Sequence, residues 1–200
     1  PWFEATWLAG SERSAGRPYA EACNWKLATP MPDAAARRVV ESPIPGKGPT
    51  LVFSALDANV AGDIEKAFAE AGHLVVSNYR MDPLVPLLIP EINPDHLQLI
   101  AQQRERYGWK GGIVTNSNCS TMFLAMALAP LRPFGLTQCN VVTLQAVSGA
   151  GYPGVPSLDI LGNIVPFIGG EEEKLEIEPQ KILGRLDGDR VVPHGVVVSA

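Results

Sequence analysis

The sequence predicts an α/β protein, and three observations support this class. Short apolar runs typical of buried strands alternate with helical patterns, and one strand–helix–strand unit is complete within residues 50–77. Hydrophobic residues make up 46% of the 200-residue chain and charged residues 18%, which is the balance of a globular protein with a sizeable core. We therefore expect parallel strands covered by helices, and we find no repeat that would indicate a solenoid or propeller.

The clearest evidence for this class lies between residues 50 and 77. Residues 51–53 have the pattern of a short buried strand. A helix follows, whose apolar positions recur at helical spacing: Val60, Ile64, Ala67, Phe68 and Ala71. Gly72 ends this helix, and residues 74–76 form a second strand. We expect the two strands to be parallel and joined by a right-handed crossover.

The same alternation continues on both sides of this unit. Residues 4–8 are expected to form the first visible strand, and residues 112–115 a later one. Asn93 is expected to cap a second helix that has Pro94 in its first turn. The character of the sequence changes after Asn116, where we place a domain boundary that divides the chain into residues 1–116 and 117–200.

The second domain is expected to mix helices and strands. Its elements, in order, are an apolar helix over residues 119–129 capped by Asn118, a strand over 138–147, a loop rich in Gly and Pro over 148–156, an acidic helix that begins at Glu171, and an apolar strand over 190–199.

Charge and cysteine content exclude several classes of function. The 16 Lys and Arg against 21 Asp and Glu give a net charge of −5, which provides no basic surface for nucleic acid or an anionic membrane. The longest apolar stretch, residues 122–131, is half the length of about 20 residues that a membrane span needs. Three cysteines at irregular spacing and no export signal indicate a reducing compartment, so we expect a cytoplasmic protein, and we expect no metal site.

Cys119 is the first candidate for chemistry. It occupies the first turn of a predicted helix, where free backbone N–H groups and the positive end of the helix dipole stabilise a thiolate. This setting suits a nucleophile, although a free cysteine also serves as a small buried apolar residue. The glycine-rich turn over residues 145–154 would let a flat ligand approach the backbone, but a hairpin or a bulge explains the glycines equally well.

Read together, three motifs resemble aspartate-β-semialdehyde dehydrogenases, most closely the archaeal and fungal branch. They are Asn-Cys-Ser-Thr at 118–121, the segment from Gln145 to Gly154, and the segment from Phe167 to Lys174. The resemblance implies a Rossmann-like dinucleotide-binding domain over residues 1–116, without its first strand and Gly-rich loop. A catalytic and dimerisation domain would follow over residues 117–200, ending before the family's general-base His and carboxylate-binding Arg.

The resemblance also implies a reaction. In this family a cysteine attacks L-aspartyl-4-phosphate, phosphate leaves, and NADPH reduces the thioester to L-aspartate-4-semialdehyde, on the way to lysine, threonine, methionine and isoleucine. Cys119 matches the nucleophile, and a thiolate suits the role because it both attacks and leaves well. Gln145 matches the residue that positions the acyl group, although it could simply make a hydrogen bond at the end of a strand. The enzyme would act as a homodimer or homotetramer.

Substrate binding would fall on four further residues. Asn118, Arg80 and Lys174 match the positions that bind phosphate, and Arg80 could hold the dianion in fork geometry. Glu171 matches the ligand of the substrate amino group. Because Glu171 and Lys174 are one helical turn apart, they could hold opposite ends of a zwitterion, although residues 171–174 also have the composition of a solvated first turn.

The cofactor would be NADP. Ser11, Arg13 and Ser14 follow the first expected strand, where an arginine and hydroxyl groups favour a ribose 2′-phosphate, although Glu12 could serve NAD instead. Within the resemblance, Ser148 and Gly149 match nicotinamide contacts. Ser54 lies at a strand end where a dinucleotide would cross.

Three alternatives remain open. Another thioester-forming reductase, such as malonyl-CoA reductase or N-acetyl-glutamyl-phosphate reductase, would share the cysteine chemistry, but Glu171 favours a substrate with an amino group. A cysteine hydrolase would need a histidine beside the thiol, and His73, His96 and His194 lie in no recognisable motif. A non-catalytic fragment would keep only the core and an oligomer surface over residues 155–168.

Overall fold

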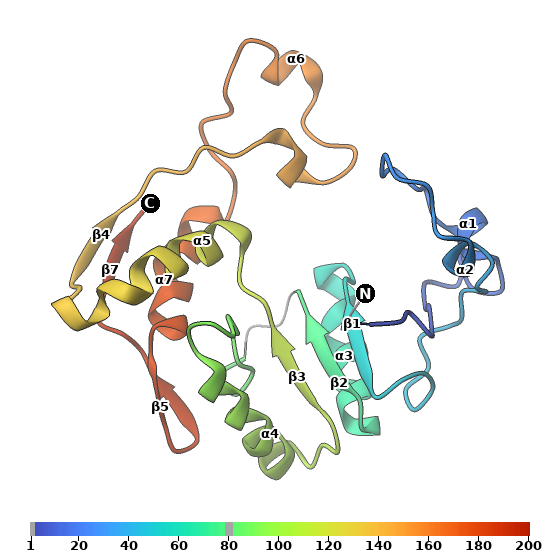
Figure 1. Cartoon of the computed structure of the whole chain (residues 1–200), viewed down its shortest axis with the longest axis horizontal. Helices are drawn as coiled ribbons and strands as arrows, with labels where there is room; N and C mark the ends of the chain where they lie inside the picture. The colour runs from blue at the N-terminus through green and yellow to red at the C-terminus, as the bar shows by residue number, and fades with distance from the viewer. Residues whose placement is uncertain (1–2, 79–81) are drawn as a thin grey trace. The chain divides into compact units, whose positions relative to one another are not determined.

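The computed structural model describes residues 3–78 and 82–200, and Figure 1 colours them in chain order. They form two compact units. The first contains Pro1–Val85 and Ile100–Thr115, and the second contains Pro86–Leu99 and Asn116–Ala200. Residues 86–99, which precede the boundary expected at residue 116, thus pack with the second unit.

A parallel sheet forms the centre of the first unit. Strands β1 (Leu51–Ser54), β2 (Leu74–Ser77) and β3 (Gly112–Thr115) lie side by side in that order. All neighbours are parallel. Helix α3 (Ala58–Ala71) connects β1 to β2 and packs against β2 and β3 (Figure 1). This confirms the parallel strand–helix–strand unit predicted from residues 50–77.

Two glycines make this arrangement possible. Gly72 ends α3 with a φ of 110°, a left-handed conformation that residues with a side chain rarely adopt. Gly111 lies so close to the preceding turn that a Cβ atom there would be 1.9 Å from the carbonyl oxygen of His73. The core of this unit consists of buried apolar side chains from α3, β2, β3 and the connecting loops: Phe68, Ala69, Val75, Val85, Trp109 and Ile113.

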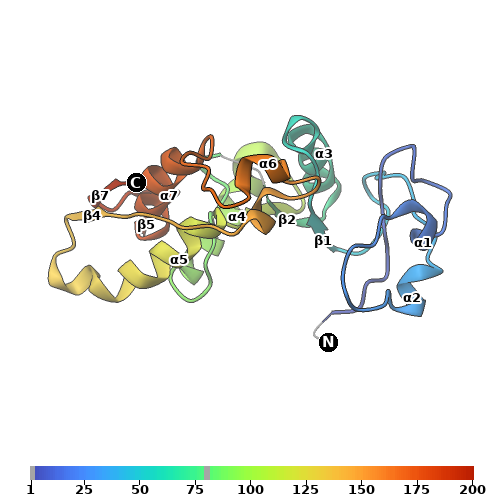
Figure 2. The ribbon, with the colours of Figure 1, turned by 90° about the horizontal axis from the view of Figure 1, so that it is seen from above.

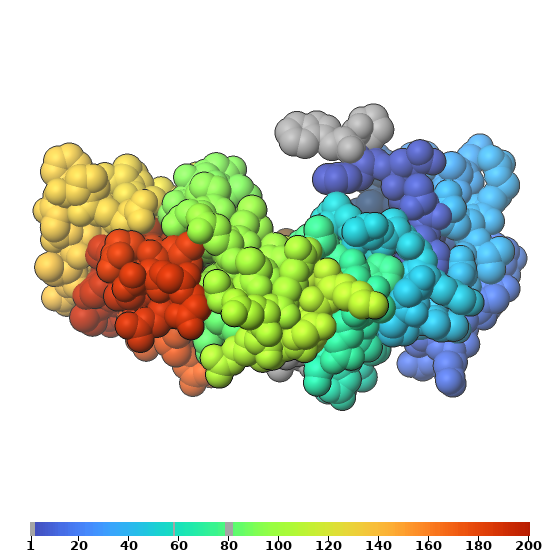
Figure 3. All heavy atoms as spheres, turned by 90° about the horizontal axis from the view of Figure 1, so that it is seen from below, coloured from blue at the N-terminus to red at the C-terminus, as the bar shows by residue number. Residues whose placement is uncertain are grey.

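Helix α4 (Leu99–Tyr107) fastens the edge of the sheet through one side chain. The buried Gln103 donates from Nε2 to the carbonyl oxygens of Leu84 and Ile113, each at 2.8 Å, and accepts from the Ile113 N–H at 2.8 Å. The outer side of the helix carries polar, exposed residues. Atoms of this part of the chain form the green surface in Figure 3. An amide thus replaces the neighbouring strand that this part of β3 lacks within the described residues.

The strand predicted over residues 4–8 is wrong. The N-terminal segment, blue in Figure 2, consists of loops with two short helices, α1 (Tyr19–Ala22) and α2 (Asp33–Ala36). Only an isolated bridge between Ala9 and Glu41 forms next to residues 4–8. Trp7 instead packs its ring against Phe68 of α3, so this segment is held by side-chain burial and has no neighbouring strand to continue a ladder.

The second unit is built on two helices. Helix α5 (Cys119–Leu128), extended by the 3₁₀ helix η2 (Ala129–Phe134), packs against α7 (Glu171–Ile182). The helices predicted at residue 119 and at Glu171 are therefore confirmed. Buried apolar residues join them to the rest of the unit: Leu87, Ile89, Ala125, Leu128, Ile182, Leu183, Val196 and Val198.

The remaining elements of this unit are short. Strand β4 (Gln138–Asn140) is parallel to β7 (Val197–Ser199), and β5 (Arg185–Asp187) is antiparallel to β6 (Arg190–Val192). Three short helices complete the unit: η1 (Pro94–Gln98), η3 (Val147–Ala150) and α6 (Ser157–Ile160).

Three sequence-based expectations for this unit need correction. The strand expected over residues 138–147 ends at Asn140, because β7 pairs with only its first three residues. The strand expected over 190–199 is divided by Pro193, which has no N–H to donate to a ladder. Asn93 does not cap its helix, since its side chain bonds the backbone of Ile89 at 2.8 Å and the ring of His96 at 2.9 Å.

Candidate active site

Cys119 begins helix α5 and its side chain is exposed. The preceding residue, Asn118, caps the helix as predicted, because its Oδ1 accepts from the backbone N–H groups of Ser120 at 2.9 Å and Thr121 at 3.2 Å. The thiol therefore stands at the positive end of a well-formed helix, open to an incoming molecule.

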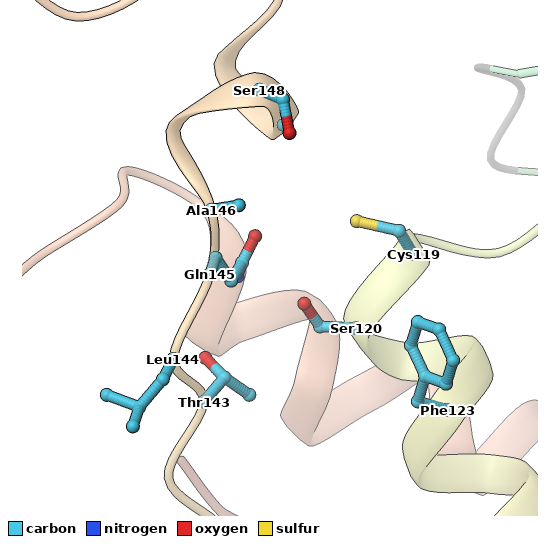
Figure 4. A pocket seen from close by; sticks show the side chains of 9 residues that line it. Cys119, Ser120, Phe123, Thr143, Leu144, Gln145, Ala146 and Ser148 are labelled. Atoms are coloured by element: carbon cyan, nitrogen blue, oxygen red, sulfur yellow. The ribbon is translucent and has the colours of Figure 1, made fainter.

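The thiol opens into a pocket of about 430 Å³. Its walls come from the first turns of α5 and from the extended chain after β4, and its lining residues are Cys119, Ser120, Phe123, Thr143, Leu144, Gln145, Ala146, Ser148 and Gly149. In Figure 4 the sulfur atom of Cys119 points across the pocket toward the segment that carries Gln145 and Ala146. The structure thus brings together residues that were predicted from two separate motifs: Cys119 from the first, and Gln145, Ser148 and Gly149 from the second.

The carboxylate of Glu171 connects both walls of this pocket. Its Oε2 atom accepts from Gln145 Nε2 at 2.7 Å and from Ser120 Oγ at 3.1 Å. Its Oε1 atom accepts from Asn118 Nδ2. Because Glu171 is the first residue of α7, the carboxylate also lies where a helix dipole favours negative charge. Three uncharged donors thus hold one carboxylate next to the thiol.

These contacts determine the charge of Glu171. Partial burial acts to raise the pKa of its carboxyl group, but the hydrogen bonds from Gln145, Asn118 and Ser120 act in the opposite direction, aided by the charge of Lys174. The net result is a pKa below the ordinary value. Glu171 is therefore an anion at neutral pH, as a ligand for an ammonium group must be.

Glu178 holds the residue that precedes Cys119 in place. It lies in α7 and is only 5% exposed, and its Oε2 atom accepts from the backbone N–H of Asn118 at 3.0 Å. Burial raises the pKa of this carboxyl group above its ordinary value. Neither Glu178 nor Ser120 was predicted as a site residue from the sequence. The spacing of seven residues between Glu171 and Glu178 places both on one helix face, and this spacing is the signal from which Glu178 could have been predicted.

One predicted phosphate-binding residue, Lys174, lies outside this cluster. Lys174 is exposed in α7 and does not line the pocket, although its charge acts on Glu171. Arg80 lies outside the described residues. Asn118 is at the site, with its side chain engaged by the helix N-terminus and by Glu171. The phosphate role of these three residues remains a prediction.

The predicted cofactor residues of the first unit occupy two places. Ser11, Arg13 and Ser14 belong to one turn, closed by a hydrogen bond of 2.8 Å from the Ser14 N–H to the Ser11 carbonyl oxygen. Ser54 is the last residue of β1. Its hydroxyl group is buried and has no hydrogen-bond partner among the described residues, so this position offers a polar atom that a bound molecule could satisfy.

The histidines have structural roles in the described chain. His73 accepts from the Gly46 N–H at 3.0 Å, and its other ring nitrogen is 2.8 Å from the Pro49 carbonyl oxygen. His194 accepts from the Val196 N–H at 3.1 Å within a turn. His96 is fully buried beside Asn93. None of the three lines the pocket, which disfavours a cysteine hydrolase with a Cys–His pair.

Comparisons with known proteins agree with the geometry. Residues 1–100 match the family model described as "Semialdehyde dehydrogenase, NAD binding domain", and residues 128–199 match "Semialdehyde dehydrogenase, dimerisation domain". These matches confirm the predicted architecture of a Rossmann-like domain followed by a dimerisation domain. The position of the boundary at residue 116 stays a prediction.

Several curated relatives of this chain have the same name. The chain is 48% identical to an aspartate-semialdehyde dehydrogenase of Archaeoglobus fulgidus and 51% identical to one of Methanothermobacter thermautotrophicus, with 100% of the chain covered in both cases. An aspartate-semialdehyde dehydrogenase of Cryptococcus neoformans is 52% identical over 94% of the chain. The chain covers 60%, 59% and 54%, respectively, of these three relatives.

A solved structure supports the same assignment. Aspartate semialdehyde dehydrogenase from Candida albicans, determined with NADP, superimposes with a TM-score of 0.86 at 41% identity, covering 100% of this chain and 59% of that one. A Vibrio cholerae structure gives 0.63 at 25% identity, covering 96% of this chain and 59% of that one. With two family models matched in order and a pocket built around the expected cysteine, the chain belongs to the semialdehyde dehydrogenase family.

Proposed function

We propose that the protein containing this chain converts L-aspartyl-4-phosphate to L-aspartate-4-semialdehyde through a thioester on Cys119. The observation that carries the proposal is that the exposed thiol of Cys119 shares a pocket with Gln145, which is hydrogen-bonded to the anionic Glu171. The names of the archaeal and fungal relatives support the choice of substrate. The product would feed the synthesis of lysine, threonine, methionine and isoleucine.

The reaction divides into two transfers at the same carbon. The Cys119 thiolate attacks the acyl carbon, a carbon–sulfur bond forms, and the bond to phosphate breaks with release of inorganic phosphate. Hydride addition to the thioester carbon then gives the aldehyde, and the sulfur leaves as the thiolate. The thiol is suited to both steps because it is a good nucleophile and a good leaving group.

The side chains around Cys119 would bind the two ends of the substrate. Glu171 would bind the ammonium group, since its lowered pKa keeps it charged. Gln145 would donate to the acyl oxygen from an amide that carries no charge to be desolvated. We assign the phosphate to Asn118, Lys174 and Arg80, of which the last offers a planar fork for the dianion.

Glu171 also distinguishes this substrate from its rivals. A malonyl group carries no cation for the carboxylate and would instead bring a second negative charge toward it. The same difficulty applies to the amide nitrogen of an N-acetylated substrate, which is not protonated at neutral pH. The geometry therefore favours an amino-bearing substrate over the other thioester-forming reductases.

The described residues fit a bound dinucleotide at two places. At the end of β1, Ser54 offers a buried hydroxyl group that has no partner in the part of the chain that the structure describes. Gly149 lines the pocket, and a Cβ there would meet only Gln145 Oε1, at 3.8 Å, so its backbone is accessible to a flat ring. NADPH, when bound, supplies the hydride for the thioester. Ser148 and Gly149 would hold the nicotinamide, and Ser54 the centre of the cofactor.

The choice of NADP over NAD would depend on one turn. Arg13, Ser11 and Ser14 would bind the 2′-phosphate, and the exposed Arg13 side chain is free to reach it. The solved Candida albicans relative contains NADP, which supports this choice.

The assembly we propose is a homodimer, with a homotetramer as the larger possibility. The match to a dimerisation domain indicates an oligomer. Residues 155–168 expose large apolar side chains, among them Leu158 at 89% and Leu161 at 74%, and we assign this segment to contact with a second copy. We place the enzyme in the cytoplasm, where its three free cysteines would stay reduced.

The test of this function is to trap the acyl group. The chain, extended to the length of its relatives, is mixed with L-aspartyl-4-phosphate without NADPH, quenched in acid and digested. Mass spectrometry should find the aspartyl group on the peptide that carries Cys119. In the Cys119→Ser variant the corresponding peptide should stay unmodified, because an alcohol is not ionised at neutral pH. Addition of NADPH before quenching should remove the adduct. An unmodified Cys119 during turnover would contradict the proposed function.

A further inference from the structure

Ser120 is the residue of the site whose function remains unexplained. It lines the pocket next to Cys119, and its hydroxyl points away from the helix into the site (Figure 4). Its Oγ atom donates to Oε2 of Glu171 at 3.1 Å, the same oxygen that Gln145 Nε2 reaches at 2.7 Å. One carboxylate oxygen thus has two donors from the two walls of the pocket.

The hydrogen bond between Gln145 and Glu171 is important because both side chains have a role in the proposed reaction. Glu171 must accept an ammonium group, and Gln145 must turn its amide toward the acyl oxygen. While the two side chains hold each other, neither is fully available. An ammonium group that binds at Oε2, which already accepts from Ser120 and Gln145, must therefore take the place of one of these two donors.

The remaining donors keep the Glu171 carboxylate hydrogen-bonded when Gln145 leaves it. Without Gln145, Glu171 still has one protein donor on each oxygen, with Asn118 on Oε1 and Ser120 on Oε2. A carboxylate oxygen accepts two hydrogen bonds, so an ammonium group can take the position that Gln145 leaves while Ser120 stays bound. Gln145 is exposed, so its amide can rotate without disturbing the core.

We propose that Ser120 is a positioning residue that holds the Glu171 carboxylate while the substrate's ammonium group displaces Gln145 from it. The released amide then donates to the acyl oxygen above Cys119. Recognition of the amino group is in this way coupled to orientation of the acyl group, and a substrate without an amino group leaves Gln145 bound to Glu171. This inference rests on the proposed function and assigns its substrate specificity to one hydrogen-bond exchange.

The exchange can be observed without turnover. L-asparagine and succinamate differ only in the amino group, and both carry an unreactive amide in place of the acyl phosphate. Each is titrated into ¹⁵N-labelled chain while the side-chain amide signals of Gln145, identified by their loss in Gln145→Glu, are followed by NMR. L-asparagine should shift the Gln145 signals, and succinamate should leave them in place. Equal shifts with both ligands would overturn the proposal.

Variants of Ser120 test its role directly. Ser120→Ala removes the hydroxyl that keeps the carboxylate in place, so L-asparagine should bind about tenfold more weakly, the effect of one hydrogen bond to a charged group. Ser120→Thr retains a hydroxyl and should restore the affinity. Ser42→Ala, which changes an exposed loop serine of the first unit, serves as the control and should bind as the wild type does.

In the extended enzyme the same variants separate positioning from a general loss of structure. Ser120→Ala should raise KM for L-aspartyl-4-phosphate by about tenfold and leave KM for NADPH unchanged, because only the amino-group ligand is affected. Wild-type kinetics in Ser120→Ala would overturn the inference. If the acyl group is trapped on Cys119 while Gln145 does not respond to L-asparagine, the exchange fails and the proposed function stands. If no acyl group is trapped on Cys119, the proposed function itself is contradicted.

Discussion

Glu171 shows how individual side chains determine the chemistry of this site. Its position at the start of an acidic helix is equally typical of a solvated first turn, in which three glutamates simply face water. The structure instead places three side-chain donors on this one carboxylate and none of these three on Glu172 or Glu173 within the described residues. The difference between a ligand and a surface charge thus lies in partners that are 26 to 53 residues away in the sequence.

The lowered pKa of Glu171 predicts a pH dependence of stability. A carboxyl group whose pKa falls on folding stabilises the protein above its ordinary pKa, and the contribution is lost as the pH falls through the lowered value. Glu171→Gln should therefore lower the urea midpoint near neutral pH, and the difference from wild type should shrink below about pH 4.3. Urea unfolding followed by circular dichroism at a series of pH values measures this.

A neighbouring glutamate is the control for this experiment. Glu172→Gln removes a charge from the same helical turn without removing a partner of Gln145, Asn118 or Ser120. It should change the urea midpoint less and with little dependence on pH. If the two variants give the same pH profile, the three hydrogen bonds do not set the charge of Glu171.

At the scale of secondary-structure elements, the N-terminus of α5 is the feature on which the site depends. Asn118 caps the helix through its side chain, while its own backbone N–H is accepted by the buried Glu178 of α7. Helix α5 is apolar and places its first turn at the pocket, so the cap fixes both the start of the helix and the position of Cys119.

The cap predicts a measurable loss of stability. Asn118→Ala leaves two helix N–H groups without an acceptor, and unfolding free energy should fall by about 1 kcal/mol. Asn118→Ser keeps a capping oxygen and should recover most of this loss, although it lacks the amide donor to Glu171. Urea unfolding of the three proteins gives the comparison. An alanine variant as stable as the wild type would show that Glu178 alone holds the helix start.

At the scale of the whole molecule, the apolar surface of the second unit requires an explanation. Strand β4 is short, and the chain that follows it exposes Val142 at 90% and Leu144 at 92%. Residues 155–168 add further exposed apolar side chains. Within the described residues no helix is both long and apolar enough to span a bilayer. Surfaces of this kind usually bind protein, which agrees with the match to a dimerisation domain.

Charge placed on this surface should weaken the oligomer. The double variant Leu158→Glu and Leu161→Glu introduces two carboxylates where a partner would exclude water, and such charges are costly to bury without a counter-ion. Sedimentation velocity should show a shift toward the monomer at equal concentration. Leu27→Glu, which changes a leucine of the first unit that is 64% exposed, should sediment as the wild type does. Equal behaviour of both variants would place the interface elsewhere.

The amino-acid sequence by itself determined the features that depend on neighbours along the chain. The strand, helix and strand from Leu51 to Ser77, the end of α3 at Gly72, and the capped helix start at Cys119 all follow from periodicity and from backbone or capping preferences within a few residues. The three motifs also identified the family, because they carry the residues of its chemistry in order.

Only the tertiary structure decided what depends on partners far apart in the chain. The apolar patterns at residues 4–8 and 138–147 suit a strand, but a strand forms only where a neighbour supplies its hydrogen bonds, and those neighbours are absent or short within the described residues. The roles of Ser120 and Glu178 stayed hidden for the same reason. Periodicity states which way a side chain faces, whereas the packing of α5 against α7 determines which donor meets which carboxylate.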